Sequence, residues 1–401
     1  MTLNELAATL DICEEIPEYL YKAYEESQND SFPMTRPDLI RLQAEYSLFD
    51  EDVFSAVLDS FDSVVQNSSL LKWAVVLRRV LINFVDTETL YSIPYPKMNG
   101  EKGRDMLHLF PLLSLFEDAL PRYERFGFSL EETLREFAVF NSSVKRSETG
   151  RFTFDRRFFA WSSAYIYGNV FRCGAINFEI TEFPDPVAVI ENVKSGERVV
   201  LITEGSFHRS GNALLSVGFS EDTAGSFNAD FFETDTEFFG RVAKEGVASS
   251  EIRSFPKSEW NMVFGKGDKG VSLHIPGGVD VSRESVKATV REGMAIVKRS
   301  FGEKIKFAFC RSWLLSPNIS ECLSQTSKII EFENCFERYP IRSSGNELMF
   351  FLFGGSYENY EDLPERTSLQ RNIKRKYLDG GYIYAGAGII TDKDFYQKSL
   401  T

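Results

Sequence analysis

The residues of this chain that could bind an anion lie between positions 271 and 283. A short apolar segment, 271–275, is predicted to form a strand that ends at Pro276 and is followed by Gly277 and Gly278. An amphipathic helix is predicted from about Arg283 onward. Glycines let a ligand approach the backbone, and a helix N-terminus offers unpaired N–H groups with a partial positive charge. The segment therefore predicts an anion site, to which Arg283 either contributes a cation or is simply a solvated charge.

Two side chains beside this segment could also carry function. Pro276 has no N–H and ends sheet pairing, so His274 is expected near the C-terminal end of its strand, where ligands of open α/β sheets gather. His274 could hydrogen-bond a ligand or act as a base, or it could be a structural histidine. Trp313, after the predicted strand 305–309, could form the wall of a pocket or belong to the core.

Several classes of chemistry have no support in the residues. The three histidines are widely spaced, and the five cysteines form no CxxC pair, so no metal site or redox pair is predicted. The chain has no GxSxG elbow, no P-loop and no GxGxxG motif opening a βαβ unit. Taken alone, the residues contain no recognised catalytic constellation.

Composition limits the partners and the location. The chain has 401 residues and a formal net charge of −14, which argues against nucleic acid or an anionic membrane surface as a partner. The N-terminus has neither the basic nor the apolar region of a signal peptide, and no apolar run is long enough to span a membrane, so a cytoplasmic protein is expected. The oligomeric state is not predicted.

The pattern of apolar residues changes along the chain and predicts an α+β protein. Residues 1–150 are expected to form a helical domain, with a polar linker near 141–150. Residues 151–401 are expected to form a mixed β-sheet domain with few helices. Strands are predicted at 170–180, 197–202, 213–219, 271–275, 305–309, 329–336, 347–353 and 382–390, and helices at 70–84, 129–140, 156–167, 231–244, 286–301 and 319–323.

Three motifs together resemble a known family. They are Leu273-His274-Ile275-Pro276, then the run Cys310-Arg311-Ser312-Trp313-Leu314-Leu315, then Phe332 and Phe336 at a spacing of four. They resemble the bacterial acyltransferase-domain proteins that join a helical N-acyltransferase N-terminal domain to a GNAT-like C-terminal domain. The chain departs from that pattern at Ser316, where the family has Asp, and it lacks the usual acetyltransferase phosphate-loop consensus.

The resemblance implies a GNAT-type fold in which acyl-CoA lies between two splayed strands, here 271–275 and 305–309. The backbone of Leu273 and Ile275 would pair with the pantetheine arm. The pyrophosphate would lie on Gly277, Gly278 and the helix N-terminus at Arg283. The cofactor requirement is then acyl-CoA as a substrate and no metal.

The function expected first is an acyl-CoA-dependent N-acyltransferase whose small-molecule acceptor is an amine. The base candidates are His274 and Glu331, with Tyr384 as the acid that protonates the leaving thiolate. Trp313 and Phe309 are candidates for the substrate pocket. The alternative is a non-catalytic GNAT-like module that binds a small ligand or a protein, which the missing phosphate-loop consensus favours; blockage between the strands by Trp313 or Phe309 would support it. A carbohydrate- or lipid-handling enzyme is a third, less supported hypothesis.

Overall fold

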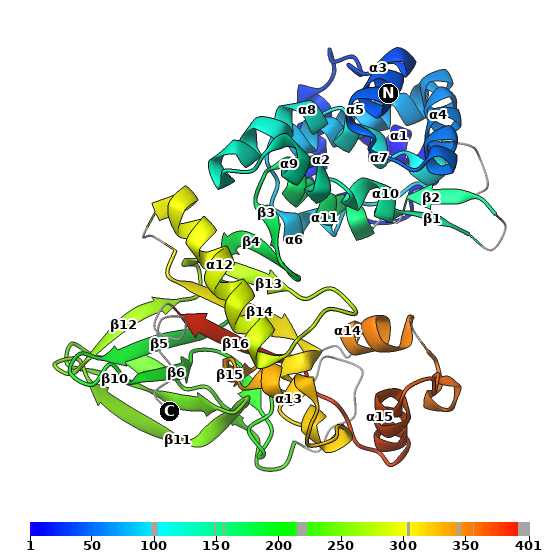
Figure 1. Ribbon diagram of the computed structural model, residues 1–401. Coiled ribbons are helices and arrows are strands. Elements are labelled where there is room, and N and C mark those ends of the chain that lie inside the picture. Colours follow the sequence, from blue (N-terminus) through cyan, green and yellow to red (C-terminus); the bar gives the residue numbers. More distant parts are fainter. Residues whose placement is uncertain are drawn as a thin grey trace. The chain divides into compact units, whose positions relative to one another are not determined.

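The computed structural model divides into two compact units, Met1–Phe171 and Arg172–Thr401 (Figure 1). It describes residues 1–97, 103–147, 150–154, 157–214, 223–302, 305–342, 346–355 and 357–391. The division falls later in the chain than the expected boundary at residue 150. Residues 141–147, where the sequence predicts a linker, instead end a helix and begin a small hairpin, in which β1 (Val144–Arg146) pairs antiparallel with β2 (Phe152–Phe154).

The N-terminal unit is helical, as the sequence predicts. Its helices are α1 (Leu3–Thr9), α2 (Glu18–Glu26), α3 (Arg36–Tyr46), α4 (Glu51–Gln66), α5 (Ser68–Ile82), α6 (Thr87–Leu90), α7 (Leu109–Leu113), α8 (Phe116–Ala119), α9 (Leu130–Glu136), α10 (Val139–Ser143) and α11 (Arg157–Ile166), with 3-10 turns η1 (Arg104–Met106) and η2 (Leu120–Phe126). The buried helix expected at 70–84 is α5, whose Trp73 is fully enclosed. The expected capping box at Ser129 is present and starts α9.

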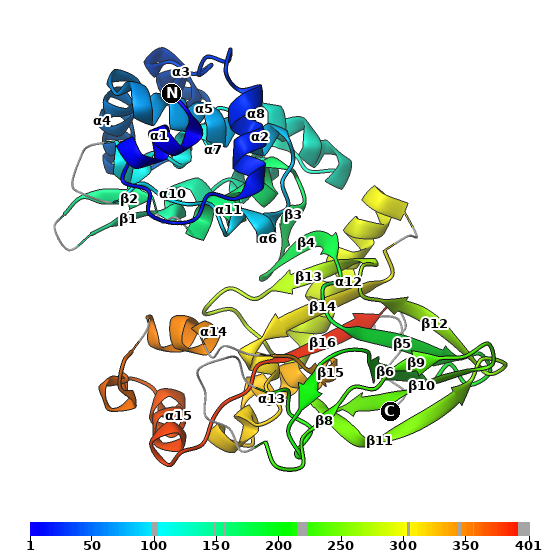
Figure 2. The same cartoon turned by 180° about the vertical axis from the view of Figure 1, so that it is seen from behind.

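The C-terminal unit contains two six-stranded sheets (Figures 1 and 2). The first has the order β15 (Glu337–Pro340), β16 (Gly386–Thr391), β14 (Phe307–Ser312), β13 (Lys269–His274), β4 (Ile176–Glu182) and β3 (Val170–Cys173). The second has the order β11 (Val247–Pro256), β10 (Glu237–Lys244), β6 (Arg198–Ile202), β5 (Val187–Asn192) and β12 (Trp260–Gly265), with β9 (Phe232–Glu233) on β10.

The first sheet has a different covering on each face. On one face lies helix α12 (Arg283–Phe301), whose Gly293 packs directly against the ring of Phe178 in β4. On the other face an aromatic core joins the two sheets, in which the ring of Phe183 contacts Phe309 at 5.0 Å and Phe264 stacks on Phe307 at 3.7 Å between centroids. Burial of these rings, together with the aliphatic side chains of the same cluster, holds the two sheets together.

The remaining elements lie at the C-terminal end of the chain. They are the helices α13 (Lys328–Glu333), α14 (Asn346–Leu348) and α15 (Ser368–Leu378), the 3-10 turns η4 (Trp313–Leu315), η5 (Ile319–Cys322) and η7 (Tyr360–Asp362), and a π-helical turn η6 (Met349–Phe353); a short hairpin of β7 (Ser206–Phe207) and β8 (Phe227–Asn228) completes the unit.

Several local predictions were wrong in type or extent. The segment 231–244, expected to be a helix, contains strands β9 and β10 instead, because pairing of β10 with β11, β6 and β9 outweighs a local helical pattern. The strand expected at 329–336 begins as helix α13, capped by Ser327, and the strand expected at 347–353 is helical. The single strand expected at 170–180 is two strands joined at Gly174, whose φ of +53° makes the turn. Of the strand expected at 213–219, residues 215–219 lie outside the described residues.

Candidate functional site

The two central strands of the first sheet run parallel and then separate. β13 and β14 pair at two positions, Val271 with Ala308 and Ser272 with Phe309. Beyond these positions each strand continues to pair with its outer neighbour, β13 with β4 as far as His274 and β14 with β16 as far as Ser312. The strands therefore form a fork, and its two arms are the C-terminal ends of β13 and β14.

The arm from β13 carries a histidine–carboxylate pair. The Nε2 atom of His274 lies 2.8 Å from Oε2 of Glu179 on β4. The strand register places Glu179 opposite Ser272, so the alternation of side chains brings His274 and Glu179 onto one face of the sheet. The side chain of His274 is 38% exposed and that of Glu179 is 13% exposed. The carboxylate can therefore orient a ring that remains accessible to a ligand.

The arm from β14 carries a cation on the same face. Arg311 follows the last paired residue, Phe309, by the same number of positions as His274 follows Ser272. Its Nε atom lies 3.2 Å from Oδ1 of Asp185, which is buried. The Tyr339 hydroxyl donates to the other oxygen of Asp185 at 2.7 Å, and burial holds the pKa of Tyr339 well above its usual value. Asp185 and Tyr339 thus fix the position of Arg311.

The glycine loop follows the β13 arm and is open. A Cβ built at Gly277 or Gly278 meets no atom within 4 Å, and Gly278 has a φ of +80°. The space above the loop is free within the described part of the chain, and the positive φ of Gly278 favours glycine. The predicted loop residues thus have room for a ligand to approach the backbone.

The N-terminus of α12 begins at Arg283, as expected, but carboxylates already lie beside it. The Arg283 backbone N–H donates to Oε2 of Glu331 at 3.1 Å. The Ser282 backbone N–H donates to Asp280, whose other partner is Lys328, with Nζ 2.9 Å from Oδ1. The hydrogen bond from Lys328 is the main reason that the pKa of Asp280 is lowered. Anions therefore do collect at this helix end, as its dipole favours.

The predicted site residues do not all come together. The side chain of Leu273 is buried, and its register partner on β4 is Phe178, which packs against α12; only its backbone could meet pantetheine. Ile275 is half-buried after β13. Phe309 belongs to the core between the sheets, whereas Trp313 packs on a separate cluster formed by the C-terminal elements. Phe309 and Trp313 therefore do not line one wall.

Tyr384 lies near the end of the β14 arm. Gly386, the first residue of the antiparallel strand β16, pairs with Ser312, the last residue of β14, and Tyr384 lies two residues before Gly386. The Tyr384 backbone N–H donates to Oδ1 of Asn318 at 3.3 Å. This places Tyr384 at the open end of the fork, the same end as His274 on the other arm.

Three further observations concern a buried thiol, metal binding and membrane-spanning helices. Cys310 lies within β14, and burial raises the pKa of its thiol to about 12, so it does not supply a thiolate nucleophile. Among the described residues, no group of histidine, cysteine, aspartate or glutamate side chains is arranged to hold a metal ion. In the same described ranges, no helix combines the length and apolar character needed to cross a membrane.

Sequence reasoning missed Glu179 and Arg311 as site residues. Glu179 stands 95 residues before His274, and only the pairing of β4 with β13 brings them together. Arg311 belongs to the run 310–315 that carries the family resemblance. The face of the sheet on which the Arg311 side chain lies, however, depends on the register of β14. The alternation of side chains from Phe309 to Arg311 was the one available signal.

A sheet whose central parallel strands separate beside a glycine loop and a helix N-terminus defines a GNAT-like fold. A family model for the GNAT-like C-terminal domain matches residues 170–390, more than half of the chain, and the chain belongs to this family. The expected combination of a helical N-terminal region with a GNAT-like domain is thereby confirmed.

Solved structures with the same fold cover nearly the whole chain. One is an acyltransferase mutant in complex with octanoyl-CoA, with a TM-score of 0.64, 13% identity, and coverage of 98% of this chain and 99% of that one. Another is an acyltransferase in complex with decanoyl-CoA and teicoplanin, with a TM-score of 0.63, 12% identity and the same coverage. No curated protein sequence matches the chain. At these identities the likeness shows the fold, which extends through both units.

Proposed function

We propose that this protein is an acyl-CoA-dependent N-acyltransferase that transfers an acyl group to an amine of a small molecule. The observation that carries the proposal is the fork between β13 and β14, where a parallel pair separates after Ser272 and Phe309. Backbone groups on the inner edges of such arms can pair with an extended amide chain, as an added strand would. Pantetheine is an extended chain with two amides.

The loop and helix after β13 would take the phosphates of CoA. Gly277 and Gly278 leave the backbone accessible, and the N-terminus of α12 attracts negative charge. The carboxylate of Glu331 occupies the first N–H of this helix in the structure. A phosphate at that position would replace the carboxylate, and Lys328 and Arg283 would remain beside it as cations.

His274 is the base that the geometry favours. The amine nitrogen attacks the thioester carbonyl carbon, its bond to carbon forms, and the carbon–sulfur bond breaks. His274 takes the proton that the amine loses, while Glu179 stabilises the imidazolium that results. Tyr384, at the open end of the other arm, would protonate the departing thiolate. By exchange with water, His274 then releases the proton that it gained and Tyr384 regains the proton that it gave. Glu331 is less suited to act as the base, since its carboxylate is held at the α12 N-terminus.

The neighbouring structures suggest the first substrates to test. They hold octanoyl-CoA or decanoyl-CoA, and one of them also holds teicoplanin. We propose a medium-chain acyl-CoA as donor, with teicoplanin and simple primary amines as the first acceptors. Arg311, which Asp185 and Tyr339 hold on the same face as His274, would orient a polar group of the acceptor.

The experiment follows release of free CoA thiol from octanoyl-CoA in the presence of each acceptor, with mass analysis of the product. His274→Ala should lower turnover by about 100-fold or more, the range of a general base, while the affinity for CoA is kept. His208→Ala, which removes a half-buried histidine of the same unit that hydrogen-bonds Ser210, is the matched control and should leave turnover unchanged. Equal turnover by the wild type and His274→Ala would remove His274 as the base.

A non-catalytic GNAT-like binding module remains the second candidate. The observation that favours it is the Glu331 carboxylate on the first N–H of α12, where a phosphate would otherwise bind. If this candidate is correct, CoA should not bind even at millimolar concentration, and no acceptor should support thiol release.

A further inference from the structure

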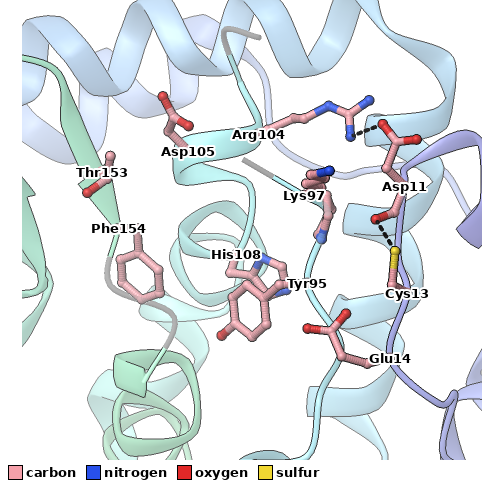
Figure 3. Close-up of a pocket in the computed structure, with 11 residues that line it drawn as sticks. Asp11, Cys13, Glu14, Tyr95, Lys97, Arg104, Asp105, His108, Thr153 and Phe154 are labelled. Carbon is pink, nitrogen blue, oxygen red and sulfur yellow. Dashed lines mark hydrogen bonds and ion pairs between the residues drawn. The ribbon is translucent and has the colours of Figure 1, made fainter. Parts of the chain in front are cut away.

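The N-terminal unit contains a cavity that the proposed transfer chemistry does not use. Its volume is about 430 Å³, and all of its lining residues belong to this unit (Figure 3). Cavities of about 300–1,000 Å³ are typical of small-molecule sites. The lining comes from residues near Asp11, from residues 95–97 with 104–108, and from strand β2.

One part of the cavity wall is aromatic and ordered. The rings of Tyr95 and His108 stack with centroids 3.7 Å apart and an interplanar angle of 16°. The ring of Phe159 packs edge-on against His108, with ring centroids 5.4 Å apart, and this contact holds the His108 ring in place. Phe154 lies on the side of Thr153 in Figure 3 and is itself buried. These flat, immobile faces suit an apolar or aromatic group of a ligand.

An anionic group lies in the same wall as Phe154. Asp105 is 8% exposed and forms an ion pair with Arg151 through Oδ2, so Oδ1 is the carboxylate oxygen that can accept from a ligand. Burial, which outweighs the effect of Arg151, raises the pKa of Asp105. A cationic ligand group at Oδ1 would offset this cost, because an opposite charge favours the ionised carboxylate.

Cationic groups lie on the opposite side. The buried guanidinium of Arg104 donates to the Leu10 carbonyl at 2.6 Å and lies 3.6 Å from Asp11, which compensates much of its charge. Lys97 is exposed at the rim and can reach an anionic ligand group. Figure 3 shows Lys97 and Arg104 on the side of Asp11, and Asp105 on the side of Thr153. A ligand that carries only a cationic group or only an anionic group would match the charges on one side of the cavity and not those on the other.

We propose that this cavity binds a zwitterionic small molecule, an amino acid or amino-acid-like compound with a large apolar side chain. Its ammonium group donates to Asp105, and its carboxylate meets Lys97. Its side chain lies against the Tyr95–His108 stack and Phe154. The site is separate in the chain from the residues proposed for acyl-CoA, and the proposal stands without the transferase activity.

The test is a calorimetric titration of the full chain with L-phenylalanine and two analogues, in the absence of acyl-CoA. Phenethylamine lacks the carboxylate, and 3-phenylpropionate lacks the ammonium. L-phenylalanine should bind with a dissociation constant below about 1 mM, and each analogue should bind at least about tenfold more weakly, since each loses one charge-assisted hydrogen bond. Failure of L-phenylalanine to bind, or equal binding of all three compounds, would overturn the proposal.

Two variants locate the binding. Lys97→Gln should weaken the binding of L-phenylalanine by about tenfold and leave the binding of phenethylamine unchanged. Lys22→Gln, at an exposed lysine of α2, is the control and should change neither affinity. Asp105→Asn should weaken the binding of phenethylamine, and Asp59→Asn on α4 is its control. Because Lys97 is exposed, its variant keeps the test decisive even if Asp105→Asn fails to fold. Unchanged affinity in Lys97→Gln would contradict the assigned site.

Discussion

The Nε2 atom of His274 lies 2.8 Å from the Oε2 atom of Glu179, across the antiparallel pair of β13 and β4. A carboxylate at this distance fixes the ring orientation and stabilises the protonated ring. It therefore favours a base at the position where the two central strands separate. Glu179 would act through His274 and is a positioning residue.

Glu179→Gln should therefore impair turnover more than binding. An amide can still hydrogen-bond the ring but does not stabilise its positive charge, so we expect kcat to fall by about 10- to 100-fold with little change in the KM for acyl-CoA.

Glu182→Gln, at an exposed position at the end of β4, is the matched control and should behave as the wild type. A purely structural role for Glu179 would lower the free energy of unfolding and leave the kcat of the folded protein unchanged.

Glu331→Gln should separate the two roles open to that residue. Its carboxylate accepts from the Arg283 N–H at the start of α12, where the proposed pyrophosphate would bind. Loss of this negative charge should tighten CoA binding by about two- to tenfold. The carboxylate would no longer compete with a phosphate for the positive N-terminus of α12 or repel it there.

Turnover by Glu331→Gln should be retained if His274 is the base and lost if Glu331 is. Glu292→Gln, on an exposed face of α12, controls for the change in net charge. The measurements are titration with CoA and thiol release from octanoyl-CoA. Weaker CoA binding by Glu331→Gln would contradict the proposed phosphate position.

Glu333 should make stability depend on pH. Burial raises the pKa of Glu333 to about 7, against the opposing effect of Arg338, whose Nη1 lies 3.1 Å from its Oε2. An acid with a raised pKa contributes stability below its unfolded-state pKa of about 4.5, and that contribution is lost as pH rises through about 7.

The free energy of unfolding of the wild type, relative to Glu333→Gln, should thus fall by about 2–3 kcal/mol between pH 4.5 and pH 8. The measurement is denaturant unfolding of both proteins across this range. A difference between the two proteins that is the same at pH 5 and pH 8 would show that Glu333 does not titrate as described.

Gly293→Ala should destabilise the C-terminal unit. A Cβ at this position would lie 2.2 Å from the Phe178 ring, so α12 and the sheet would have to move apart. Overpacking of this kind costs about 1–3 kcal/mol, more than the gain in helix propensity from glycine to alanine. Gly277→Ala, whose Cβ meets no atom within 4 Å, is the control and should unfold as the wild type in a thermal scan.

Local patterns were sufficient to predict the central segment of the sheet. Pro276, the glycine pair and the apolar spacing of α12 are all within one stretch, and the structure has the strand, the loop and a helix that begins at Arg283. The GNAT-like fold was predicted from a motif that ends at Pro276 and two further motifs after α12, and it is confirmed. The helical character of the N-terminal region was likewise readable from its caps and periodicity.

Long-range pairing accounts for what the sequence did not reveal. Within the segment 231–244, expected to be a helix, β10 is a strand because β11 and β6 flank it. The partner of His274 is 95 residues away. The orientation of Arg311 toward Asp185 depends on how β14 pairs with its neighbouring strands, and a short segment of sequence does not contain that information. The cavity at Asp105 and His108 draws on three separated segments, and these residues have no spacing that marks a site.

The most direct test of the account is a calorimetric titration of the purified protein with octanoyl-CoA and free CoA. We predict micromolar binding by the wild type that is lost in Gly277→Leu, since the open space above Gly277 accepts a side chain without disturbing the protein and leaves no room for the phosphates. Absence of binding by the wild type at millimolar CoA, or equal binding by Gly277→Leu, would contradict acyl-CoA at this fork and loop.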